Sequence, residues 1–161
     1  MTHESVVTFL KDVSKSLSDQ VKFDYGSFDD FNSITQKSYP WIWLYPLNGE
    51  FVASENKISS HIKWDIQLDF LDKDNPRGSQ FDTAQTWDRS FDLMEKFIHK
   101  LDEKVLGGED DIDDIQSNNI VIDSATFEPA RKVTGDVITG WQLKLSVTTS
   151  TDFNYCSLYE D

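Results

Sequence analysis

The residues with the most chemistry to offer are the carboxylates of a short acidic run. Residues 109–114 read Glu-Asp-Asp-Ile-Asp-Asp, and carboxylate oxygens are the ligands that Ca²⁺ and Mg²⁺ prefer. The run lacks the glycine at the sixth loop position and the ordered ligand spacing of an EF-hand. A solvated charge run is therefore the default interpretation, and no metal is expected. Asp72 and Asp74 form a still weaker pair of the same kind.

The other chemically capable side chains share no spacing that is typical of a site. His3, His61 and His99 show no metal-ligand pattern with one another or with Cys156. The sequence contains no Walker loop, glycine-rich dinucleotide turn, nucleophile elbow or Cys-x-x-Cys pair. Acid–base catalysis needs two groups held over one cleft, and the pattern singles out no such pair of carboxylates. We therefore expect no enzyme, no catalytic residue and no cofactor.

Composition and charge narrow the class of partner. The 161 residues include 29 Asp and Glu against 15 Lys and Arg, a formal net charge of −14. Nucleic acids and anionic membranes both attract clustered Lys and Arg, so neither partner is favoured. Cys156 is the only cysteine and cannot form an intrachain disulfide. Because no membrane span or signal-peptide pattern is visible, a soluble protein folded in a cytoplasm is expected.

The strongest secondary-structure pattern is the alternation over Ile62–Phe70. Every even position is apolar and every odd position is polar, which is typical of a strand with one buried face. Residues 137–149 repeat this pattern, with apolar side chains at 141, 143, 145 and 147. Both stretches predict an antiparallel sheet that is covered on one face only.

Two amphipathic helices are predicted to cover that face. Residues 4–18 carry apolar side chains at helical spacing. A longer helix is expected to begin near Asp82, which forms a capping-box pattern with Gln85, and to end at Gly107-Gly108. Its apolar stripe advances in steps of three and four residues: Ala84, Trp87, Phe91, Met94, Ile98, Leu101 and Val105.

We expect this stripe to lie on the even residues of the alternating strand. In that arrangement Trp87, Phe91 and Met94 cover positions 64, 66 and 68. Further strands are predicted at 21–25, 41–45, 51–53 and 120–128, with turns at Asn48-Gly49 and 134–136. Residues 26–39 and 72–81 are predicted to be loops, and 152–161 a tail. The fold class is α+β: one domain over 1–161, with a single antiparallel or mixed sheet, one long helix on one face and a second, N-terminal helix.

The strand Trp41–Tyr45 is apolar on both faces and is bounded by Pro40 and Pro46. Such a strand either fills the core of its own chain or carries one face into a contact with another chain, and both interpretations stay open. On the second interpretation the candidate subunit-contact residues are Phe31, Trp41, Trp43, Tyr45, Phe153 and Tyr155.

The order of these elements resembles the phage tail terminator and tail-completion family, with its related neck and minor tail proteins. The resemblance covers most of residues 4–149. It rests on three local features: the start Pro40-Trp41-Ile42-Trp43, the Trp64–Phe70 strand that leads into a helix with Trp87 and Arg89, and the strand Gly140-Trp141-Gln142-Leu143. It implies a one-sheet, helix-backed virion subunit that forms a ring of six, or twelve, copies between tail tube and neck or connector proteins.

The extended 26–39 segment and the acidic 109–114 segment depart from that family pattern. If the resemblance holds, Asp110, Asp111, Asp113 and Asp114 are candidates to line or flank a channel that repels DNA phosphates. An acidic inhibitor or immunity-type protein that binds a basic partner is the alternative, because a charge of −14 would steer such an encounter. An adaptor of a contractile injection system is a third possibility. All three are binding roles without catalysis.

Overall fold

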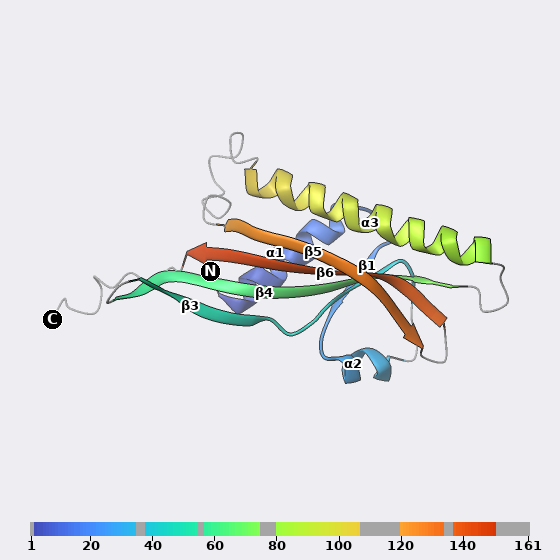
Figure 1. Cartoon of the computed structure of the whole chain (residues 1–161), viewed down its shortest axis with the longest axis horizontal. Helices are drawn as coiled ribbons and strands as arrows, with labels where there is room; N and C mark the ends of the chain where they lie inside the picture. Colours follow the sequence, from blue (N-terminus) through green and yellow to red (C-terminus); the bar gives the residue numbers. More distant parts are fainter. Residues whose placement is uncertain are drawn as a thin grey trace.

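The computed structural model describes residues 2–34, 38–54, 57–74, 80–106, 120–133 and 137–150. The chain is α+β, as predicted, with helices on a mixed sheet (Figure 1). Its elements are α1 (His3–Lys15), β1 (Lys22–Tyr25), α2 (Phe28–Ser33), β2 (Trp41–Leu44), β3 (Asn48–Ser54), β4 (Lys57–Lys73), α3 (Gln80–Leu106), β5 (Ile120–Val133) and β6 (Val137–Ser150).

The sheet is built around the 17-residue strand β4. The strand order is β1-β2-β4-β6-β5, and β3 also pairs with β4. The β1–β2 pair is parallel, whereas the other pairs are antiparallel. On one side of β4, Leu44 of β2 lies opposite Leu68 and Asn48 of β3 lies opposite Asp65. Strands β2 and β3 therefore follow one another along that side, and β6 and β5 lie on the other.

The helix-covered face has the predicted register. The even residues 64, 66, 68 and 70 of β4 are buried, and β6 places 147, 145, 143 and 141 directly opposite them. Helices α1 and α3 cover this face. The apolar side chains of the helices, at helical spacing, pack between the alternate side chains of the strands. The buried helix residues of this main core are Val6, Leu10, Val13, Leu93, Met94, Phe97 and Leu101.

Helix α3 is rotated relative to the predicted stripe. Met94 and Leu101 are buried as expected, but Leu93 and Phe97 join them, while Ala84 is exposed. The reason is that α3 packs on β4 and β6, so its flank towards β5 is only partly covered. The prediction that Trp87 and Phe91 cover the centre of β4 is therefore wrong, because both rings pack against Trp141 at the rim. The helix also begins at Gln80, so Asp82 lies inside its first turn and does not cap it.

The opposite face of the sheet is not open along its whole length. Helix α2, which lies in the segment predicted to be a loop, covers one end of that face (Figure 1). Its Phe31 lies against the two indoles of β2, with ring centroids 5.0 Å from Trp41 and 5.2 Å from Trp43. Leu71 and Ile138 complete this second apolar cluster. The prediction of a sheet covered on one face only is corrected accordingly.

A capping box fixes the start of α2. The amide of Asp30 donates to the hydroxyl oxygen of Ser27 at 3.2 Å, and the amide of Ser27 donates to the Asp30 carboxylate at 2.7 Å. The hydroxyl of Ser27 also donates to that carboxylate, and these Ser27 contacts lower the pKa of Asp30. Two otherwise unpaired amides are satisfied, which allows a helix of only six residues to form.

Other boundaries also differ from the sequence prediction. Asn48 and Gly49 do not form a turn, because both lie within β3 and pair with Asp65 and Trp64 of β4. The Trp64 indole lies over Gly49. A Cβ at position 49 would come within 2.8 Å of that ring, which explains a glycine inside a strand. Strand β5 reaches Val133, beyond the predicted end at 128.

Candidate functional site

The part of the chain that the structure describes gathers no metal-ligand group. No three His, Cys, Asp or Glu side chains within those residues come together as ligands. The candidate channel residues Asp110, Asp111, Asp113 and Asp114 lie outside the described residues, so their role stays a prediction. No helix in the described ranges is long and apolar enough to cross a membrane.

The one carboxylate that is completely buried among the described residues belongs to Asp69. The alternation of apolar and polar residues along β4 predicts that the side chain of Asp69 faces solvent. The exposed fraction of Asp69 is instead 0%. The hydroxyl of Tyr45 donates to Oδ2 at 2.7 Å and Nε2 of Gln142 donates to Oδ1 at 2.9 Å. Burial, and then the neighbouring carboxylate, raise the pKa of Tyr45. The charge is thus held by donors from two other parts of the sheet, which is the requirement for burying a carboxylate.

Beside this network, the uncovered part of the sheet forms a shallow hollow of about 260 Å³. Its floor comes from the outward side chains of β4, β5 and β6. The ammonium group of Lys144 is paired with Glu128 at 2.6 Å, and the hydroxyl of Ser146 has no hydrogen-bond partner among the described residues. The lining offers hydrogen-bond donors and acceptors, so it can bind polar groups. The polar side chains that line it are Tyr45, Asn48, Asp65, Gln67, Ser124, Thr126, Lys144 and Ser146.

The exposed large apolar side chains of the described residues lie on strands at the two sides of the sheet and on α2. On β5, Val121 is 57% exposed and Phe127 is 53% exposed. The others lie on β1, the adjoining α2 and β3, at the far edge: Tyr25, Phe28, Phe51 and Val52. The most exposed is Phe51, at 63%. Strand β3 reaches beyond the end of α3 (Figure 1).

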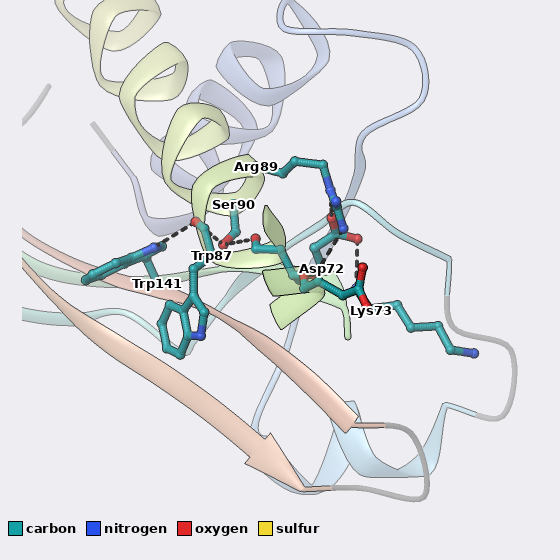
Figure 2. Close-up of polar contacts among 8 residues, drawn as sticks. Asp72, Lys73, Trp87, Arg89, Ser90 and Trp141 are labelled. Carbon is teal, nitrogen blue, oxygen red and sulfur yellow. Dashed lines mark hydrogen bonds and ion pairs between the residues drawn. The ribbon is translucent and has the colours of Figure 1, made fainter. Parts of the chain in front are cut away.

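An aromatic cluster joins the β5 edge to the flank of α3. The Phe127 ring lies 5.6 Å from Phe91 and 5.7 Å from Trp141, and Trp141 lies 5.2 Å from Trp87. The Trp141 indole donates to the backbone carbonyl of Trp87 at 3.1 Å, as Figure 2 shows. This contact ties α3 to β6 and leaves the outer side of Phe127 uncovered.

A polar contact holds α3 from its other flank. Figure 2 shows Arg89 reaching the carboxylate of Asp72 near the end of β4, and the Nε–Oδ2 distance is 2.8 Å. Nη2 of the same guanidinium also donates to the hydroxyl of Thr86 at 3.1 Å. Because Arg89 is about half exposed, the pair contributes orientation more than stability. Together with the Trp141 contact, it fixes the helix over β4 and β6.

The predicted subunit-contact residues have different fates. Phe31, Trp41 and Trp43 are at most 1% exposed and fill the second cluster of their own chain, so their assignment to a contact surface is corrected. The indole of Trp43 even finds its partner inside the chain, donating to the carbonyl of Gly26 at 3.1 Å. Tyr45 is half-buried and holds Asp69. Phe153 and Tyr155 lie outside the described residues.

The exposed edges at β3 and β5 were not predicted from the sequence. Phe127 pairs with Leu143 and therefore lies on the helix side of β5. Phe127 is exposed because β5 is the outermost strand of the sheet, whereas α3 packs mainly on β4 and β6. The local sequence pattern does not show which strand is outermost. A register shift between Ile122 and Ser124 also reverses the faces along β5.

No family model matches this chain, and no curated protein matches it either. The proposals below therefore rest on the residues, their placement and the resemblance stated above.

Proposed function

We propose that this chain is a non-catalytic structural subunit of a phage tail or neck, of the tail terminator or tail-completion kind. It works as one copy in a ring, with six copies expected and twelve the alternative. Its partners are copies of itself and the adjoining tail-tube and neck or connector proteins, and its location is the virion. Specific binding of nucleic acid and of membranes is not part of the proposal.

The observation that carries the proposal is the separation of the exposed apolar residues into two unlike surfaces. Val121 and Phe127 lie at the β5 edge, while Phe51 and Val52 lie on β3 at the other side of the sheet. A ring subunit meets its neighbours through different patches, and a subunit between two assemblies also needs more than one contact. A domain that plugs a single partner needs only one such surface.

Charge gives the proposal further support. Each chain carries a formal charge of −14, and DNA that moves through a ring is repelled by carboxylates and meets few cationic contacts. Asp110, Asp111, Asp113 and Asp114 remain the candidates for the channel side. The same charge favours the second candidate function, an acidic inhibitor or immunity-type protein that binds a basic partner one to one.

Two kinds of experiment test the proposal. Native mass spectrometry and electron microscopy of the protein show whether it forms rings. Immunogold labelling of phage particles that encode the chain shows where it lies in the virion. We expect closed rings of six copies and label at the tail or neck. Phe51→Asp should abolish the rings, because it places a charge on the β3 surface. Gln85→Asp adds the same charge on the exposed outer side of α3 and should leave the rings intact. A chain that is absent from particles and binds a basic protein one to one would favour the inhibitor.

A further inference from the structure

The outer edge of β5 and the flank of α3 beside it form a second kind of surface, which we call the β5 surface. It is defined by Ser124–Glu128 of β5, the Phe127 and Phe91 rings, and the α3 carboxylates named below. All residues from Asp123 to Pro129 are exposed. Strand β5 pairs only with β6 among the described residues, so one row of its backbone amides and carbonyls has no strand beside it.

The α3 side of the β5 surface alternates apolar and acidic residues. Asp88, Phe91, Glu95, Ile98 and Asp102 follow one another in steps of three and four, which places them in one line along the helix. The three carboxylates are exposed, and none of them has an ion pair with a described residue. Two other α3 acids differ, since Asp92 is paired with Lys96 and Glu103 with Lys100.

The surrounding sequence adds negative charge and little positive charge. Residues 107–119, which join α3 to β5, contain five Asp and Glu and no Lys or Arg. On β5 itself, Glu128 is paired with Lys144, and Asp123 accepts a hydrogen bond from Thr148. The basic residues of β5, Arg131 and Lys132, lie beyond Pro129, outside the stretch that offers its edge.

We propose that the β5 surface binds an extended segment of another protein in which Arg or Lys alternates with apolar residues. The segment adds as a strand along Ser124–Glu128, between the bulge and Pro129, and so satisfies the free backbone edge. Its basic side chains lay their stems on Phe127 and reach Asp88, Glu95 and Asp102. A second copy of this chain is a poor occupant of this edge, because each copy carries −14, so in the proposed ring the β5 edge faces an adjoining tail or neck protein and not a like subunit. The inference does not depend on the ring role, and each can fail without the other.

The probe is a fluorescein-labelled eight-residue peptide of alternating Arg and Val, titrated into the full chain and followed by fluorescence anisotropy. We expect saturable binding that weakens with salt, and slower amide hydrogen exchange at Ser124–Glu128. A Glu-Val peptide of the same length should not bind. An Arg-Val peptide with a central proline should bind at least about 10-fold more weakly, because it lacks one backbone donor.

Variants locate the site. Phe127→Ala, and separately the triple variant Asp88→Asn/Glu95→Gln/Asp102→Asn, should each weaken binding by about 10-fold. The matched controls, expected to stay within about 2-fold of the parent, are Phe28→Ala and the triple variant Asp12→Asn/Asp19→Asn/Glu50→Gln. The inference is overturned if the Arg-Val peptide does not bind up to about 1 mM, if the Glu-Val peptide binds equally well, or if the control variants weaken binding as much.

Discussion

The hydroxyl of Tyr45 and the carboxylate of Asp69 meet at 2.7 Å in a part of the sheet where Asp69 has no exposed surface. Tyr45 directly follows β2 and Asp69 lies in β4, so this contact joins two strands at the border between the second apolar cluster and the open hollow. Gln142 of β6 supplies the other donor. One buried charge therefore connects three neighbouring parts of the sheet.

Loss of this charge should be costly. Asp69→Ala leaves the hydroxyl of Tyr45 and the amide of Gln142 without their acceptor, and we expect the free energy of unfolding to fall by about 2–4 kcal/mol. Urea denaturation of both proteins measures the difference. Asp65→Ala removes an exposed carboxylate from the same strand and should change stability by less than about 0.5 kcal/mol. Equal effects of the two substitutions would show that the buried network does not stabilise the fold.

Stability should also fall in alkali through Tyr45. Its pKa in the folded protein is raised above the ordinary 10.0, first by burial and then by the Asp69 carboxylate. Above pH 10.0 the folded state keeps the Tyr45 proton that the unfolded state releases. The contribution of this hydroxyl to the free energy of unfolding is therefore complete below pH 10.0 and is lost as the pH rises above that value. Urea titrations between about pH 8 and about pH 11 should show a decline of up to about 1.4 kcal/mol per pH unit. Tyr45→Phe should flatten this decline, whereas Tyr25→Phe, at an exposed site, should not.

The sequence analysis correctly predicted those elements whose burial follows a simple period. Strand β4 and its partner β6 alternate cleanly, and the even residues of β4 are buried as expected. Asp69 breaks the pattern because its environment depends on Tyr45 and Gln142, which are distant in sequence. The sequence pattern of an alternating strand is the same whether a polar side chain contacts water or is buried against two hydrogen-bond donors.

The remaining errors have a related physical cause. The apolar stripe of α3 follows from the spacing of residues within the helix alone. The rotation of the helix about its axis in the structure depends on which strands lie beneath it. Phe97 is therefore buried without belonging to the stripe, and Phe91 belongs to the stripe but lies at the rim. The second cluster was also hidden, because six residues of helix in a polar stretch carry too little period to recognise.

Truncation in the main core should reveal its close packing. Leu68 is fully buried under the helices, and Leu68→Ala should lower the free energy of unfolding by about 2–5 kcal/mol through lost contacts and a cavity. Thermal or urea unfolding measures this change. Gln67→Ala, at the adjacent position on the other face, serves as the control and should have a much smaller effect. A small effect at Leu68 would contradict the assigned register.

Gly140 of β6 lies opposite Leu71, directly against the backbone of β4. A Cβ at this position would overlap the backbone carbonyl oxygen of Phe70 and lie 3.1 Å from the Cα of Leu71. Since the obstacle is backbone, Gly140→Ala should force the two central strands apart and destabilise the fold by several kcal/mol, about 3 or more. Gly49→Ala meets only the Trp64 ring, which can shift, and should cost less. Chemical denaturation of both variants gives the order, and a reversed order would contradict this explanation.

Phe31 decides between a core and a contact role for the aromatic cluster on β2. It is fully buried against Trp41 and Trp43, so Phe31→Ala should lower the free energy of unfolding of the isolated chain by about 3–5 kcal/mol. Phe28→Ala is the matched control in the same helix. That ring is 48% exposed, and its loss should cost less than about 1 kcal/mol. Urea denaturation at low protein concentration, where association is negligible, separates the two effects. If Phe31 instead belonged to a contact between chains, Phe31→Ala would weaken association and leave the stability of the single chain unchanged.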